Sequence, residues 1–282
     1  FLESSVFIQS FVYICDGSVL KVRHIAKLQN VSGKHRTTAT QRITRQKMKL
    51  DIKFNVYTDA NGGDPDSTSP TLRSYHKLLW SKPLPSGQTF ELDNKKSGTY
   101  LYHKSELGEF NLGSDAITHS YRNQTRKQWL IKQIPNEVNE LFDIGSTIGA
   151  YTLFPKNKID NKFTINQARG VNSLIDDRFD LTLECIRLFY AGQQSPLYDT
   201  FLRYKNFFDL FENFKGYIDF FLLNDLVDES ENIRFYLPFD NFKTKPTFRD
   251  IDEYLVYKKK VTDFINARNK RIDNYANKRT TE

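Results

Sequence analysis

Cysteine is scarce in this sequence. The chain of 282 residues contains two, Cys15 and Cys185, which give neither a disulfide framework nor the spacing of a zinc site. This excludes small disulfide-stapled secreted domains and zinc-finger modules, and it favours a reducing, cytoplasmic location. Cys185 lies in the apolar helical run LTLECIRLFY, which predicts a buried, inert thiol and not a nucleophile.

Long apolar runs are absent as well. No stretch approaches the roughly 18 consecutive apolar residues of a membrane-spanning helix. The apolar segment near the N-terminus, SSVFIQSFVYICDGSVLKV, is interrupted by Gln9, Asp16 and Gly17 and has no basic region before it. It is a poor signal peptide, so we expect no membrane partner.

The common catalytic and cofactor signatures are also missing. The sequence has no P-loop, no G-x-G-x-x-G, no H-E-x-x-H and no G-x-S-x-G. Several large enzyme classes are therefore excluded in their usual form, and no cofactor can be named.

Charge is present and unevenly distributed. The chain carries +7, but residues 1–47 hold eight basic residues against two acidic ones, which leaves the remainder near neutral. These residues could form a basic arm that binds phosphates. Alternatively, translation starts at Met48, the only methionine, where a strand-like pattern begins. We predict that 1–47 is a basic leader, disordered or not native, and that 48–282 is a single domain.

The first half is predicted to be rich in β-strands. Apolar and polar residues alternate over 51–58, which predicts a strand, and the Gly- and Asp-rich DANGGDPDSTSP predicts a loop. Ser69 and Pro70 begin a predicted helix over 69–80. Further short strands are expected in QTFEL, GTYLYHKS, GEFNLG and STIGAYTLFP, and Pro135 should break a helix over 127–145.

The second half changes to helical spacing. Helices are expected over 176–190, 197–211, 216–227 and 250–277, with a late strand or extended segment over 233–242. Ten Phe lie between 201 and 242, and their spacing predicts core packing. Strands first and helices afterwards predict an α+β fold, in which a β-rich N-terminal half packs against an aromatic-rich helical C-terminal half.

Three long strings carry a resemblance to a known family. DANGGDPDSTSPTLRSYHKLLWSKPLP, YLYHKSELGEFNLGSDAITHS and ARGVNSLIDDRFDLTLECIRLFYAG resemble a bacterial family that is catalogued only as a domain of unknown function. The resemblance covers about 48–282 and implies no activity.

The candidate catalytic residues cluster in the β-rich half. In the strand pattern YLYHKS, His103 and Ser105 share a face, so the imidazole could activate the hydroxyl or hold a phosphate. A histidine satisfied by a neighbouring carbonyl is the alternative. Asp115 and His119 follow in SDAITHS and complete the candidate catalytic set.

Other polar residues are candidates for binding. His76, Arg122 and Arg169 could contact a phosphorylated ligand. The loop DANGGDPDS holds the weak metal candidates Asp59, Asn61, Asp64 and Asp66, but their spacing is not that of an EF-hand, and turn capping is the favoured interpretation.

Two functional hypotheses follow. The first is an enzyme or ligand-binding protein that acts on a nucleotide or another phosphorylated substrate. The second is a non-catalytic interaction module that binds an acidic protein or RNA. Residues 243–282 hold 11 basic and 6 acidic residues, so nucleic acid could bind through the C-terminal helix or the basic leader only.

Overall fold

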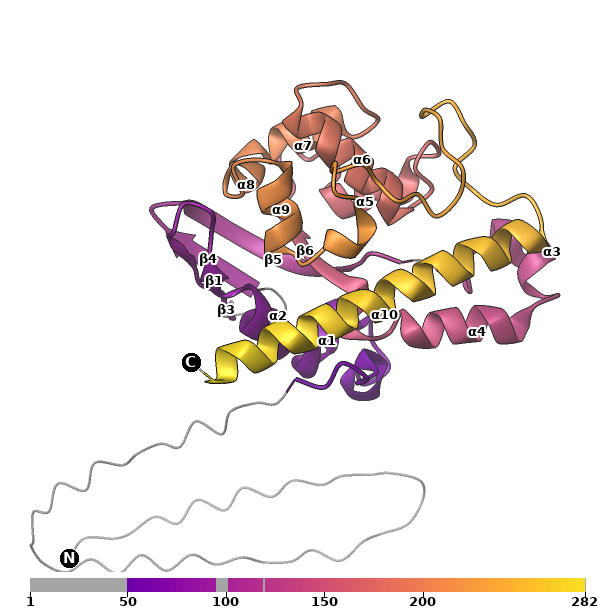
Figure 1. The fold of residues 1–282 in the computed structure, drawn as a ribbon, viewed down its shortest axis with the longest axis horizontal. Helices are drawn as coiled ribbons and strands as arrows, with labels where there is room; N and C mark the ends of the chain where they lie inside the picture. Colours follow the sequence, from indigo (N-terminus) through magenta and orange to yellow (C-terminus); the bar gives the residue numbers. More distant parts are fainter. Residues whose placement is uncertain (1–49, 95–100, 119, 282) are drawn as a thin grey trace, which may run out of the picture. The chain divides into compact units, whose positions relative to one another are not determined.

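The computed structural model describes residues 50–94, 101–118 and 120–281, so the predicted leader and His119 lie outside the described residues (Figure 1). The first elements of the described chain are a 3-10 helix, η1 (Val56–Asp59), and two α-helices, α1 (Pro65–Thr68) and α2 (Pro70–Trp80). The α2 helix confirms the prediction: Ser69 accepts a hydrogen bond from the Leu72 N–H, and Pro70 occupies the first turn.

The strand predicted over 51–58 is wrong. The Asn55 side chain accepts from the Tyr57 N–H and caps η1, and the Asp51 carboxylate accepts from the Lys53 N–H. Such local side-chain bonds offer the backbone an alternative to a sheet ladder. The apolar residues of the alternating pattern still face inward, since Val56 is buried and Ile52 and Phe54 pack against the core.

Two antiparallel sheets follow. The smaller pairs β1 (Lys82–Pro83) with β2 (Thr89–Phe90). The larger has the order β3 (Asp93–Asn94), β4 (Leu101–Ser105), β5 (Gly108–Ala116) and β6 (Tyr151–Pro155). The long strand β5 pairs with β4 through its first half and with β6 through its second half, where Asp115 lies opposite Thr152. The second half of β5 is also contacted by α1, so both of its faces are buried.

Helices occupy most of the remaining chain. Between β5 and β6 lie η2 (Thr125–Lys127), α3 (Gln128–Ile131), α4 (Pro135–Ile144) and η3 (Ile148–Ala150). Pro135 separates α3 from α4, as predicted. After β6 come α5 (Ile165–Val171), α6 (Phe179–Tyr190), α7 (Tyr198–Arg203), α8 (Lys205–Asp209), α9 (Phe214–Phe220), η4 (Asn224–Leu226) and α10 (Ile251–Thr281).

Three predictions in this half need correction. The single helix expected over 197–211 is divided at Tyr204 into α7 and α8. The helix expected over 216–227 ends at Phe220, because Leu222 adopts a left-handed φ of 54° that no α-helix accommodates. The extended segment over 233–242 contains no described strand, only an isolated bridge between Val227 and Ile233.

The core is strongly aromatic. Of the ten Phe between 201 and 242, seven are buried, and Phe235, Phe239 and Phe242 pack against the core. Figure 1 shows α5 to α9 gathered in one group, while α10 runs beside α4. The architecture is α+β, with small sheets in the N-terminal half and helices in the C-terminal half, as predicted.

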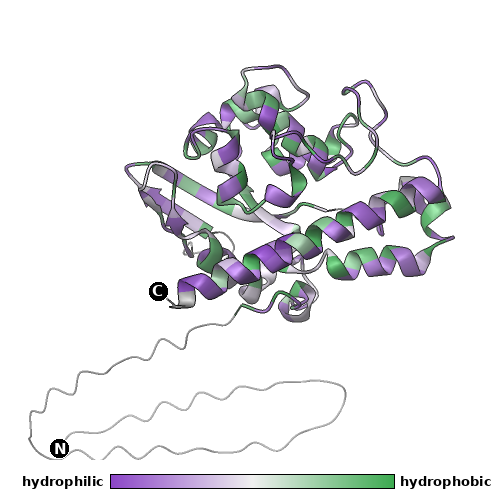
Figure 2. Ribbon diagram, viewed as in Figure 1, coloured by the Kyte–Doolittle hydropathy of each residue, from purple (hydrophilic) through white to green (hydrophobic). Residues whose placement is uncertain are grey.

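The helix α10 connects several parts of the domain. Its hydrophobic and hydrophilic residues alternate along the helix in Figure 2, and it contacts α2, α4, η3 and η4. The fully buried Arg268 donates from Nη1 to the carbonyls of Gly149 and Tyr151, and from Nη2 to that of Phe221. None of the helices in the described part of the chain combines the length and apolar composition needed to cross a membrane.

Candidate functional site

A series of hydrogen-bonded polar side chains, buried except for the half-buried Asp66, links α2 to β5 and α1. Trp80 Nε1 donates to His76 Nδ1 at 2.9 Å, and His76 Nε2 lies 2.8 Å from Ser114 Oγ. Because indole can only donate, the neutral imidazole must carry its proton on Nε2 and donate it to Ser114. The Ser114 hydroxyl is then free to donate to the Asp66 carboxyl, a hydrogen bond that favours the ionised form of Asp66. His76 therefore orients Ser114 and does not act as its base.

Burial shifts the pKa values of two residues in this hydrogen-bonded series, His76 and Asp66. Burial, with a smaller effect of the Arg268 charge, lowers the pKa of His76 to about 3. Burial and the neighbouring charge of Asp64 raise the pKa of Asp66 to about 7, although Lys156, Ser114 and Arg169 act in the opposite direction. Asp66 can thus exchange a proton near neutral pH.

Arg169 is the centre of a second buried cluster. It projects from α5 with its Nη1 3.6 Å from Asp115 Oδ2 and its Nη2 3.3 Å from Asp177 Oδ1, while its Nε donates to Thr182 Oγ1. Asp115 Oδ2 makes no hydrogen bond, and burial raises its pKa well above the usual range despite the nearby arginine. The structure therefore brings two predicted residues together, Asp115 and Arg169, but it surrounds Arg169 completely with protein.

His103 and Ser105 also lie together, as their shared face predicted. His103 Nε2 is 2.8 Å from Ser105 Oγ, and His103 Nδ1 is 2.7 Å from the Glu91 carbonyl oxygen. Since a carbonyl can only accept, Nδ1 carries a proton, and in the neutral imidazole Nε2 then accepts from the serine hydroxyl. The Leu107 N–H donates to the same Ser105 oxygen across the β4–β5 turn, and the imidazole stacks on Phe90 at 4.2 Å between ring centroids. The pair therefore stabilises the turn between β4 and β5. Its catalytic role stays a prediction.

The remaining predicted residues are placed separately. Asp59 accepts from Ser69 Oγ and from the Thr71 N–H, and Asp64 caps α1, so both support helix starts. Asn61 takes a left-handed φ of 51° in the same loop. Among the residues described, no group of three His, Cys, Asp or Glu side chains could hold a metal ion. Arg122 stacks over Phe142 at 4.6 Å and lines a small cavity of about 170 Å³.

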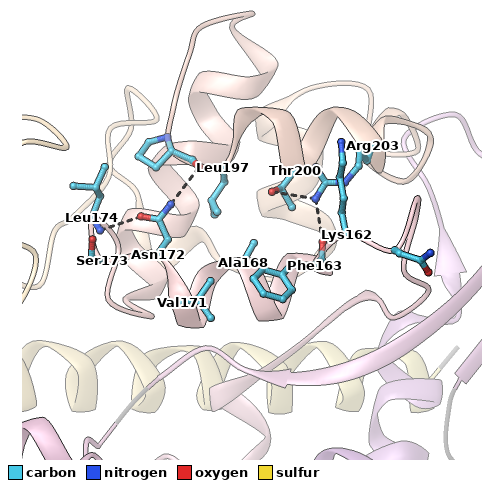
Figure 3. Close-up of a pocket in the computed structure, with 12 residues that line it drawn as sticks. Lys162, Phe163, Ala168, Val171, Asn172, Ser173, Leu174, Leu197, Thr200 and Arg203 are labelled. Carbon is cyan, nitrogen blue, oxygen red and sulfur yellow. Dashed lines mark hydrogen bonds between the residues drawn. The ribbon is translucent and has the colours of Figure 1, made fainter.

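A hollow of ligand size lies elsewhere, between α5 and α7. It has a volume of about 760 Å³, within the range of small-molecule sites. Figure 3 shows the side chains of both helices and of the segment before α5 around it. Its lining consists of Asn161, Lys162, Phe163, Ala168, Val171, Asn172, Ser173, Leu174, Pro196, Leu197, Thr200 and Arg203.

The groove walls are held by their own side chains. The Arg203 Nη2 donates to the Phe163 carbonyl and to Thr200 Oγ1, as the dashed lines in Figure 3 show. Asn172 donates to the Pro196 carbonyl and accepts from the Leu174 N–H. These bonds use the polar groups of Thr200 and Asn172 internally. Lys162 and the exposed faces of Phe163 and Val171 remain available to a ligand.

Sequence reasoning missed the groove. Its residues come from 161–174 and 196–203, and no motif marks either segment. Phe163, Val171 and Leu174 are exposed apolar residues in and beside α5, but the sequence alone does not show that they are exposed. Ser114 was missed too, because its role depends on contacts with α1 and α2 that a strand pattern does not predict.

The fold is α+β, and the groove between α5 and α7 is one of several ligand-sized hollows in the described structure. Residues 50–272 match a protein family described as "Family of unknown function (DUF6994)", and the chain belongs to this family. The match confirms the resemblance inferred from the sequence. Comparisons with curated proteins and with solved structures give no match.

Proposed function

We propose that this protein binds a phosphorylated small molecule of the nucleotide class in the groove between α5 and α7. The observation that carries the proposal is the combination of a cavity of about 760 Å³, an aromatic ring and two cations in one lining. Phe163 is 51% exposed and offers a face on which a base can stack. Lys162 and Arg203 supply positive charge for a phosphate.

The charge of the groove supports an anionic ligand. In the part of the chain that the structure describes, no carboxylate forms an ion pair with Lys162 or Arg203. Both cations can therefore be neutralised by a ligand. The lining residues include no His, Cys, Asp or Glu, so the groove provides binding without an acid–base group of its own.

The direct test is calorimetric titration of the protein with AMP, ADP and adenosine. We expect AMP and ADP to bind more tightly than adenosine, because the phosphate contacts Lys162. The variant Lys162→Met should lower the affinity for AMP about tenfold, the value of one hydrogen bond to a charged group. Lys158→Met is the matched control, because Lys158 is exposed nearby but does not line the groove. Equal affinities of both variants, or no binding of any nucleotide, would contradict the proposal.

A second candidate function is the docking of an acidic protein segment. The specific observation in its favour is the exposure of Val171 (64%) and Leu174 (42%) beside Phe163, since clustered exposed apolar side chains mark interaction surfaces. An acidic, apolar peptide that displaces AMP would favour this candidate over nucleotide binding.

The wider assignments from the sequence are also proposals. A bacterial origin is supported by the family resemblance. A cytoplasmic location is supported by the scarcity of cysteine and by the buried, unpaired Cys185, whose thiol pKa burial raises to about 12. A single domain over 48–282 is supported by a family match that spans 50–272.

A further inference from the structure

Lys82 occupies an unusual position for a lysine. It begins β1 and is only 6% exposed. Its Nζ lies over three aromatic rings, 4.6 Å from the centroid of Phe220, 4.7 Å from that of Tyr275 and 5.2 Å from that of Trp80. Within the described residues, no carboxylate forms an ion pair with this ammonium group.

Asp219 and the three rings favour the ammonium form of Lys82, whereas burial and two arginines oppose it. The helix α10 places Arg279 and Arg268 near Lys82, and both disfavour a further positive charge. From α9, Asp219 favours the charged form, but its carboxylate forms an ion pair with Lys215. Burial is the largest effect, and together these groups lower the pKa of Lys82 to about 7. A substantial fraction of Lys82 is then a neutral amine at physiological pH.

The amine also lines a cavity. A hollow of about 500 Å³ between β1 and α9 is lined by Lys82, Asn213, Lys215 and Tyr275, among others. A neutral lysine in an apolar setting beside other cations is the arrangement that activates this side chain as a nucleophile. Lys215 and Asp219 line the same cavity and form an ion pair there, and the Lys215 ammonium group has further N–H donors that a ligand's carboxylate can contact.

We propose that Lys82 forms an imine with a 2-oxo acid that enters this cavity. The nitrogen lone pair attacks the ketone carbon, and the C=O π electrons move to oxygen, which takes a proton. The carbinolamine then loses water as the C=N bond forms. The overall change is amine plus ketone to imine plus water, so no oxidant or reductant is needed. The carboxylate of the acid lies towards Lys215.

Reductive trapping tests the proposal. The full chain is incubated at pH 7 with pyruvate and sodium cyanoborohydride, and peptide mapping by mass spectrometry locates the reduced adduct. We expect Lys82 to be modified first, with a rate that rises with pH around 7. Lys215 is the internal control, because it lines the same cavity but its hydrogen bond and ion pair with Asp219 raise its pKa. The variant Lys82→Arg keeps a cation over the three rings but lacks the amine, so the rapidly formed adduct at this position should be lost.

Two results would overturn the proposal. In the first, Lys215 and other exposed lysines of the folded wild-type protein are modified as fast as Lys82. This comparison needs no variant. The other is a Lys82 that reacts with acetaldehyde but not with pyruvate, which would rule out the 2-oxo acid as its partner. Wild-type mapping keeps the test decisive if Lys82→Arg does not fold.

Discussion

His76 Nε2 and Ser114 Oγ lie 2.8 Å apart, and the histidine is the donor of this hydrogen bond. The direction follows from Trp80, whose Nε1–H occupies Nδ1 of the same ring. A histidine next to a serine suggests that the imidazole activates the hydroxyl as a nucleophile. Here Nε2 carries a proton and cannot accept one from Ser114, so His76 is not its base. The pair instead orients the Ser114 hydroxyl towards Asp66.

This relationship predicts one tautomer that does not titrate near neutral pH. ¹⁵N NMR of the imidazole should show protonated Nε2 and unprotonated Nδ1 down to acidic pH, because burial lowers the pKa of His76 to about 3. In the unfolded chain the ring binds a proton below about 6.5. The free energy of unfolding should therefore fall as pH drops from about 6.5 towards 3. Titration of His76 near its ordinary pKa would contradict this prediction.

Asp66 should have the opposite effect on the pH dependence of stability. Its folded pKa of about 7 exceeds the value of about 3.9 for an unfolded aspartate, so the folded state binds the extra proton. Stability should then decrease as pH rises from about 4 to 7. We expect Asp66→Asn to be more stable than wild type at pH 8 and similar to it at pH 4, measured by urea unfolding. Asp240→Asn, at an exposed site, should differ from wild type at neither pH.

Arg268 should be sensitive to any substitution. Its guanidinium donates to the carbonyls of Gly149, Tyr151 and Phe221, and a side chain without these donors leaves several buried carbonyls unsatisfied. We expect Arg268→Met and Arg268→Lys to lower the free energy of unfolding by about 2–4 kcal/mol. Arg271→Lys is the matched control on the same helix, because its partly exposed ion pair with Asp225 should contribute less than about 1 kcal/mol. Equal losses at Arg268 and Arg271 would contradict the structural role of Arg268.

The His103–Ser105 pair should contribute to stability. His103→Ala removes a buried ring that stacks on Phe90 and bonds to Glu91, so we expect a loss of about 2–4 kcal/mol. Ser105→Ala should cost about 1 kcal/mol. Both values can be read from urea unfolding curves, with Ser86→Ala in an exposed loop as the control. Labelling of Ser105 by a fluorophosphonate, abolished in His103→Ala, would instead support the catalytic hypothesis.

Much of the fold could be predicted because its signals are local. Ser69 and Pro70 begin α2, Pro135 separates α3 from α4, and the spacing of aromatic residues marks the helical half. The failures occurred where distant partners decide the structure. Residues 51–58 alternate like a strand, but none of the strands in the described ranges pairs with them, and Asn55 caps η1 locally.

The candidate sites were less predictable for the same reason. The proximity of His103 and Ser105 follows from a period of two within one strand. The proximity of Asp115 and Arg169 could not be predicted, since 53 residues separate them and the ion pair depends on how α5 packs on the sheet. Lys82 looks ordinary in the sequence, because the rings around it come from α2, α9 and α10.

The position of α10 has a consequence for biosynthesis. This helix covers α2 and α4, and its Arg268 supplies the donors for carbonyls at the start of β6. A ribosome makes residues 251–272 after nearly everything that they cover. Trp80 and the other residues that α10 covers therefore lack their final packing until residues 251–272 have been made, and apolar surface that stays exposed during that interval favours aggregation.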